Sequence, residues 1–154
     1  MIHCGEIDDK FLQRLLKSES DDLTLCSAGG GVYVMAAAID NLLGRAEAGR
    51  RLNIKGTGCI MSAAVPILAA GTYRTATPST RFMVHECNTK LAGNSGLILA
   101  EAPEIKRIED EYWILLGKLT KRKAAWWREQ CRGRPFYFSA GKAKVWGVID
   151  KIAT

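Results

Sequence analysis

Residues Gly58 to Gly71 read Gly-Cys-Ile-Met-Ser-Ala-Ala-Val-Pro-Ile-Leu-Ala-Ala-Gly, an apolar run of small residues with one hydroxyl, that of Ser62. Residues 52–57 predict a strand, and the residues from Ser62 onwards predict a buried helix that ends at Gly71. A serine between a strand and a helix start lies beside backbone N–H groups that have no helical partner. This arrangement is typical of a nucleophile beside an oxyanion site. Taken alone, a small residue that lets a helix pack closely on a sheet is the commoner explanation.

The composition indicates one globular domain, because a chain of 154 residues with 47% apolar and 25% charged residues can bury a core of its own. No apolar run is long enough and free enough of charge to cross a bilayer. Residues 1–6 lack the basic and apolar regions of a signal peptide. The five cysteines occur singly, without a CxxC pair. We therefore expect reduced thiols, a cytoplasmic location, no metal and no cofactor.

The net charge of +6 is concentrated in residues 118–134, where seven basic side chains surround Trp126 and Trp127. Basic residues interleaved with aromatic ones can bind nucleic acid. However, Glu129 interrupts the run, and no known nucleic-acid-binding module surrounds it. A solvated helix face with two packing tryptophans is the better interpretation, and we expect no nucleic-acid partner.

Two successive units of strand, glycine turn and helix predict the fold class. Residues 23–27 form the first strand, which leads through Ala28-Gly29-Gly30-Gly31 into a helix from Val32 to Leu43, closed by Gly44. The second unit is the one around Ser62. Two such units predict a right-handed βαβ arrangement with a mainly parallel sheet. The remaining elements are expected as helices at 7–16, 121–130 and from Ser139 to about 147, and as strands at 73–76, 81–85 and 148–150.

The glycine turn and a histidine are the other candidate functional features. The turn lacks the Gly-Lys-Ser/Thr ending and the GxGxxG spacing of phosphate-binding loops. An oxyanion site and plain tight packing both remain open for it. Of the two histidines, His3 lies near a terminus, whereas His85 ends an apolar strand and is expected at the rim of the same sheet as Ser62.

Residues 97–119 predict a long helix whose apolar residues recur with heptad-like spacing on more than one face. Pro103 is expected to kink this helix or to break it near Ala102. A helix of this kind suggests contact with another subunit.

Four motifs in the same order resemble the ClpP family, the self-compartmentalising proteolytic subunits of the Clp protease. The family's Ser-Pro-Gly-Gly, nucleophile helix, Pro-Asn-Ser-Arg-Val-Met-Ile-His and Leu-Ser-Ala…Tyr-Gly-Leu-Ile-Asp motifs are matched here by residues 27–30, 58–71, 78–85 and 138–150. The resemblance covers nearly the whole chain. It implies an α/β fold, the ClpP/crotonase-type βαβ superhelix with a mainly parallel sheet, and a protruding handle at about residues 90–120.

The resemblance also implies roles for individual residues. Ser62 would be the nucleophile and His85 its general base, and the backbone N–H groups of Gly30 and Ala63 would form the oxyanion hole. Residues 90–96 would offer an edge to a bound peptide. The implied assembly is a homo-oligomer of stacked heptameric rings that receives peptide or unfolded protein from an AAA+ unfoldase. Because the chain begins almost at its first helix, without the segment that forms the family's axial loops, unfoldase docking is left open.

The third position of the catalytic triad departs from the family pattern. The family's aspartate precedes the Phe-Ser-Ala motif, and the matching residue here is Cys131. A neutral thiol is a poor acceptor for an imidazole N–H. Glu129 is the nearest carboxylate in sequence, but two residues along a helix it points about 200° away.

Three functions are therefore considered. The first is a serine endopeptidase with an acyl-enzyme on Ser62, weakened by Cys131. The second is an impaired structural subunit that assembles into or modulates a Clp complex. The third is a CoA-thioester enzyme of the related crotonase fold. Retention of both Ser62 and His85 favours the first function, since the third has no need of this pair.

Overall fold

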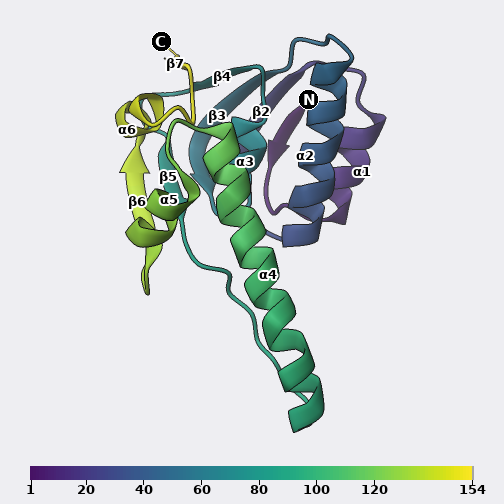
Figure 1. The fold of residues 1–154 in the computed structure, drawn as a ribbon. Helices are drawn as coiled ribbons and strands as arrows, with labels where there is room; N and C mark the ends of the chain where they lie inside the picture. The colour runs from purple at the N-terminus through teal and green to yellow at the C-terminus, as the bar shows by residue number, and fades with distance from the viewer. Residues whose placement is uncertain (154) are drawn as a thin grey trace.

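The sheet is built mainly from parallel strands, as a computed structural model that describes residues 1–153 shows (Figure 1). Its strands are β1 (Ile2–Cys4), β2 (Asp22–Ser27), β3 (Asn53–Met61), β4 (Tyr73–Ala76), β5 (Arg81–Val84), β6 (Phe136–Ser139) and β7 (Lys151–Ile152). The order β1-β2-β3-β4-β7 is parallel throughout. The far half of β3 pairs with β5, also in parallel, and β6 joins β5 antiparallel. The predicted α/β class with a mainly parallel sheet is confirmed.

The helices pack around this sheet, and one of them also projects from it. They are α1 (Asp9–Lys17), α2 (Val32–Glu47), α3 (Ala64–Ala69), α4 (Ser95–Leu119), α5 (Ala124–Cys131) and α6 (Ala140–Val145). Figure 1 shows α4 running away from the body of the molecule, so that the end near Ser95 stands free. No helix in the described part of the chain is both long and apolar enough to span a membrane.

One glycine-based prediction of a helix end was wrong. Helix α2 does not close at Gly44 but continues to Glu47. Gly44 lies on the exposed side, with open space around its Cα, so the helix tolerates it at a cost of about 1 kcal/mol. The chain turns instead at Gly49, whose φ of 83° is the conformation that ends many helices. Around the nucleophile candidate, β3 runs on to Met61 and the buried helix begins only at Ala64 and ends at Ala69.

Pro103 does not break α4 at Ala102, because the helix is continuous from Ser95 to Leu119. A proline inside a helix removes one backbone hydrogen bond and crowds the preceding turn. Here Pro103 is exposed on the projecting part of the helix, where water can satisfy the freed carbonyl group.

Strands β1 and β6 were not predicted, and the final strand lies at Lys151–Ile152 rather than at 148–150. Strand β6 carries Phe138, which stacks on Phe82 of β5 with ring centroids 5.2 Å apart. Trp127 is fully buried in the same aromatic cluster, and Trp126 packs against Trp127 and Trp146. The tryptophans of the basic segment therefore belong to the hydrophobic core.

Candidate active site

Ser62 occupies a sharp turn between β3 and α3. Its φ of 51° is the one positive value found for a non-glycine residue in the described chain. The Ser62 N–H donates to the Met83 carbonyl at 2.7 Å, and the Ser62 carbonyl accepts from the Val65 N–H at 3.0 Å. Left-handed backbone at a serine is strained and persists where the surroundings fix it, which is common at functional sites. The fully buried helix α3 is that fixed surrounding.

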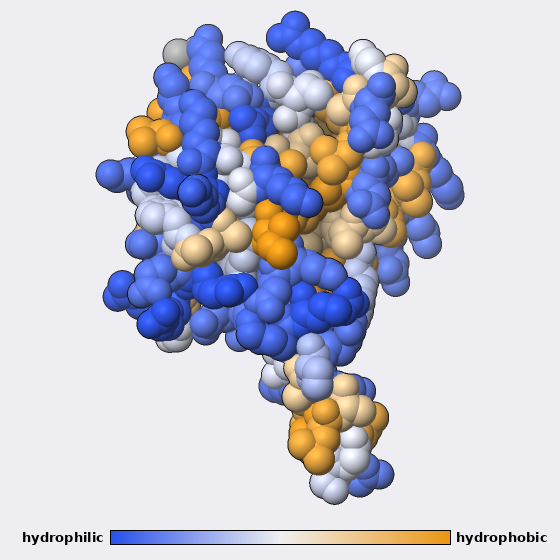
Figure 2. Space-filling view, viewed as in Figure 1, coloured by the Kyte–Doolittle hydropathy of each residue, from blue (hydrophilic) through white to orange (hydrophobic). Residues whose placement is uncertain are grey.

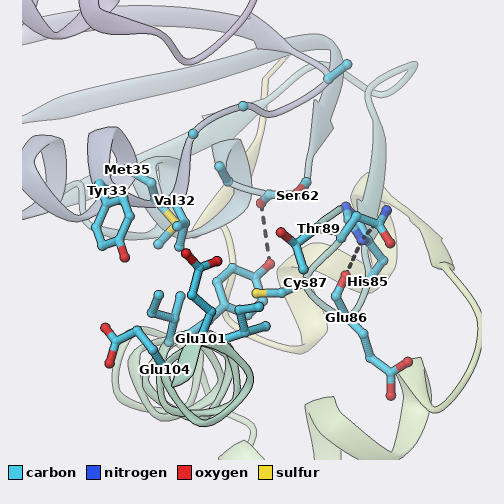
Figure 3. A pocket seen from close by; sticks show the side chains of 18 residues that line it. Val32, Tyr33, Met35, Ser62, His85, Glu86, Cys87, Thr89, Glu101 and Glu104 are labelled. Atoms are coloured by element: carbon cyan, nitrogen blue, oxygen red, sulfur yellow. Dashed lines mark hydrogen bonds between the residues drawn. The ribbon is translucent and has the colours of Figure 1, made fainter. Parts of the chain in front are cut away.

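His85 reaches the same edge of the sheet through strand pairing. Strands β3 and β5 are parallel neighbours, and Met61 pairs with Met83. Because the carboxyl ends of paired parallel strands meet, Ser62 and His85 each follow their strand at one edge, where ligands bind in open α/β sheets. Both residues line a cavity of about 670 Å³ (Figure 3). Within residues 1–153, no hydrogen bond joins the Ser62 hydroxyl to the His85 ring.

The backbone orients the His85 ring. Its Nδ1 lies 2.5 Å from the carbonyl oxygen of Glu86. A carbonyl oxygen carries no proton, so the proton of this hydrogen bond belongs to Nδ1. The second ring nitrogen, Nε2, is then unprotonated and able to accept a proton. The Asn88 amide nitrogen is farther from Nδ1, at 3.4 Å, and does not displace this arrangement.

The glycine turn packs directly against Ser62. A Cβ atom on Gly29 would lie 2.7 Å from the Ser62 Cβ, and one on Gly30 would lie 2.3 Å from the Ile7 carbonyl oxygen. The Ile7 N–H donates to the Gly29 carbonyl at 2.8 Å, and the Gly31 N–H donates to the Ile7 carbonyl at 2.9 Å. These contacts leave room only for glycine at both positions and hold the turn in place.

Two residues that line the cavity with Ser62 have backbone N–H groups without an acceptor in the described structure. They are Gly30 and Ala63, and no group in the described residues accepts from the N–H of either. Unpartnered N–H groups next to a hydroxyl are the elements of an oxyanion hole. The sequence-derived candidates Ser62, His85, Gly30 and Ala63 are thus brought together at one cavity.

Cys131 and Glu129 are not part of this group. Cys131 ends α5 with its side chain fully buried, and burial, together with the nearby Glu86 carboxylate, raises the pKa of its thiol to about 12. The thiol is therefore neutral. The exposed Glu129 pairs with Arg132 at 2.7 Å. Neither residue lines the cavity, and neither is a hydrogen-bond partner of His85 in the described structure.

Other residues of the cavity were not singled out from the sequence. The Tyr112 hydroxyl donates to the Ser62 carbonyl at 3.4 Å, and burial raises the pKa of this phenol. Glu101 and Glu104 reach the cavity from α4, opposite Ser62 (Figure 3). Cys87 follows Glu86, and its backbone N–H donates to Glu109 at 3.3 Å. Tyr112 belongs to the predicted apolar pattern of the long helix, which was the one available signal for it.

Among residues 1–153, no group of three or more His, Cys, Asp or Glu side chains is arranged to hold a metal ion. What the arrangement provides is a hydroxyl, a nitrogen base and paired N–H donors. These are the groups required for acyl transfer.

Comparisons with known proteins show which family the chain resembles. A family model described as Clp protease matches residues 9–154. An ATP-dependent Clp protease proteolytic subunit from Oltmannsiellopsis viridis is 27% identical, over 98% of this chain and 82% of the relative. A protein of the same name from Huperzia lucidula is 34% identical over 90 residues, which cover 56% of this chain and 43% of that relative.

Proposed function

Because the chain belongs to the Clp protease family, we propose that it is a serine endopeptidase that hydrolyses peptide bonds through an acyl-enzyme on Ser62. The observation that carries this proposal is the strained Ser62 turn, which lies beside two unpartnered backbone N–H groups and shares one cavity with His85. The two relatives are named as proteolytic subunits, which supports the same reaction class.

In the proposed reaction, the Nε2 of His85 accepts the hydroxyl proton of Ser62 while the serine oxygen attacks the peptide carbonyl. The N–H groups of Gly30 and Ala63 stabilise the negative charge that develops on the carbonyl oxygen. His85 then donates its proton to the departing amine, and a water molecule repeats the sequence to release the acyl group. The hydrogen bond between Ser62 and His85 forms on substrate binding, since catalytic hydrogen bonds often tighten only in the complex.

The Glu86 carbonyl supports this chemistry less strongly than a carboxylate does. It holds Nδ1 protonated and so selects the tautomer that the base requires. It carries no full charge with which to stabilise the imidazolium. Replacing the charged partner in a catalytic triad typically costs about 10⁴-fold in rate, yet leaves catalysis above background. We therefore propose a slow peptidase.

The second candidate is the catalytically impaired structural subunit, and the neutral thiol of Cys131 favours it. In both cases we propose a homo-oligomer, because apolar side chains stand exposed on the free end of α4. Peptide or unfolded protein is the proposed substrate of the active form.

A peptidase assay on a short fluorogenic peptide separates the two candidates. Ser62→Ala and His85→Ala should each abolish hydrolysis, and the double variant should be no slower than either, because the two residues act as a unit. Ser79→Ala is the matched control, since Ser79 is an exposed serine in the turn before β5, outside the cavity. Independent, multiplicative losses contradict the mechanism, and an inactive wild-type chain supports the structural subunit.

A further inference from the structure

Three cysteines gather at the same end of the sheet, on neighbouring strands. Cys4 ends β1 and is the direct pairing partner of Cys26 on β2, and Cys59 lies near the end of β3. Cys4 is exposed, and Cys26 and Cys59 are partly exposed. All three line a second cavity of about 550 Å³, whose wall includes the glycine turn. These thiols are therefore both close to one another and open to small molecules.

The strand register suits a bond between Cys4 and Cys26. Side chains that are directly paired on neighbouring parallel strands point to the same face, and such strands lie about 4.8 Å apart. The Cα atoms of a disulfide usually lie about 4.4–6.8 Å apart. Cys59 offers no such register, because the pairing of β2 with β3 is irregular between Leu25 and Ser27.

The three thiols differ in reactivity. Hydrogen bonding from the Cys59 backbone N–H, and contact with the neighbouring thiols, lower the pKa of the Cys26 thiol. The pKa values of Cys4 and Cys59 are raised, for Cys4 chiefly by Cys26 and for Cys59 chiefly by burial. The thiolate is the reactive form, so the lowered pKa favours Cys26 over Cys4 as the attacking group.

The strands that carry Cys4 and Cys26 are also connected to the glycine turn. The Gly5 N–H donates to the Cys26 carbonyl at 3.0 Å. Two residues later, Ile7 exchanges hydrogen bonds with Gly29 and Gly31. Gly29 in turn packs on the Ser62 side chain. Hydrogen bonds and packing contacts within a few residues thus connect Cys4 and Cys26 to the turn beside Ser62.

We propose that Cys26 is a thiol-oxidation site at which a small neutral peroxide produces a disulfide with Cys4, and that this bond slows the reaction at Ser62. The regulatory half rests on the proposed function, whereas the disulfide itself does not. Hydrogen peroxide suits the site because Glu6 also lines the cavity and would repel an anionic oxidant.

The chemistry balances in two steps. The Cys26 thiol first releases its proton to water, and the thiolate attacks one peroxide oxygen, so that the O–O bond breaks and hydroxide leaves. The hydroxide takes up the released proton and becomes water. The Cys4 thiol then attacks the sulfur of the resulting sulfenic acid, the S–O bond breaks, and a second water leaves with the Cys4 proton. Two thiols are oxidised and one peroxide is reduced.

The disulfide would move the strand ends. Its Cβ atoms lie about 3.8 Å apart, which is closer than neighbouring strands normally bring them. A displacement of about 1 Å at a catalytic group can cost up to 10²-fold in rate. We expect a loss of about 10-fold, because the shift reaches Ser62 through the turn rather than directly.

The test treats the full chain with hydrogen peroxide, blocks the remaining thiols and maps the linked peptides by mass spectrometry without reduction. The expected product is an intramolecular Cys4–Cys26 disulfide, with peptidase activity about 10-fold lower and restored by dithiothreitol. Cys59→Ser, the matched control, should form the same disulfide. Cys4→Ser should stop at a sulfenic acid that dimedone traps, and should keep the activity of the untreated chain.

Several results overturn the proposal. A Cys26–Cys59 bond, dimers linked through Cys4, or thiols that survive the treatment each refute the site. A complete Cys4–Cys26 disulfide with unchanged activity refutes the regulatory role. If the untreated chain shows no peptidase activity, the proposed function fails, while the peptide map still decides whether the oxidation site exists.

Discussion

Cys131 stands at the position where the resemblance places an aspartate, with its thiol buried and neutral near Glu86. A neutral thiol contributes no charge to stabilise a protonated His85. We therefore expect Cys131→Ala to keep kcat within about 3-fold of the wild type, provided that the variant folds. A much larger loss of kcat in an intact variant would show that the thiol takes part in the reaction.

Cys131→Asp tests the same position in the opposite direction. If the new carboxylate reaches the imidazole, it stabilises the charged ring and raises kcat, by up to about 10²–10⁴-fold. Glu86 would repel this carboxylate and raise its pKa, so the gain should grow as the pH rises above neutrality. Glu129→Gln is the control and should change little, because Glu129 is exposed and pairs with Arg132. Loss of activity in Glu129→Gln, with no gain in Cys131→Asp, would assign the third role to Glu129.

The sequence could indicate the side chains of the candidate site but not its backbone. Ser62 comes after one predicted strand and His85 ends another, so their meeting at one edge follows from parallel pairing. The role of the Glu86 carbonyl has no side-chain signal, because it depends on how the chain turns after β5. Likewise, the pairing of Cys4 with Cys26 required β1, a strand of three residues that no local pattern announces.

Helix α4 divides into a buried part and an exposed part, which the heptad-like spacing did not distinguish. Tyr112, Trp113 and Leu116 are buried in the core, and Leu115 packs against it. At the free end, Leu97, Ile98 and Leu99 are exposed. Figure 2 shows this hydrophobic group at the tip of the projecting helix. Periodicity indicates that a face is apolar, whereas tertiary packing decides what covers it.

The exposed tip predicts self-association through α4. Leu99, which is 72% exposed, is the residue to change, and Leu99→Glu should lower the sedimentation coefficient of the assembly because it places a charge in the apolar contact. Leu16→Glu on α1 is the matched control, an exposed leucine far along the chain from the tip. A wild-type chain that sediments as a monomer at micromolar concentration, or an assembly that Leu99→Glu leaves unchanged, would contradict this prediction.

At the scale of the whole molecule, one arginine connects elements from three parts of the chain. Arg74 on β4 binds Asp150, just before β7, through two side-chain hydrogen bonds of 2.6 and 3.1 Å. Its guanidinium also donates to the Leu119 carbonyl at the end of α4, at 2.9 Å. The sequence pattern did not indicate this connection, since Asp150 was expected inside a final strand at 148–150, whereas it lies just before β7.

The ion pair predicts an acid-dependent part of stability. Arg74 lowers the pKa of Asp150, so the pair stabilises the fold above the ordinary aspartate pKa of about 4 and loses this contribution as the pH falls through the lowered value. Asp150→Asn should cost about 1–2 kcal/mol at pH 7, since the pair is partly exposed, and should remove that acid-dependent part. Urea unfolding at pH 7 and below pH 4 measures both effects. Glu111→Gln is the control: it removes an exposed ion pair with Arg107 on α4 and should leave the urea midpoint unchanged. An equal shift of the midpoint in this variant would show that the pair of Arg74 and Asp150 contributes no more than an ordinary exposed ion pair.

The most direct test of the account is covalent labelling of the intact chain by a fluorophosphonate, read by intact mass. A serine activated by His85 and the N–H groups of Gly30 and Ala63 should take up one phosphonyl group in the wild type. Ser62→Ala should take up none, and His85→Ala should react far more slowly. Labelling that persists in Ser62→Ala, or a wild-type chain that stays unlabelled while a known serine hydrolase reacts fully, would contradict the assignment of Ser62 as the nucleophile.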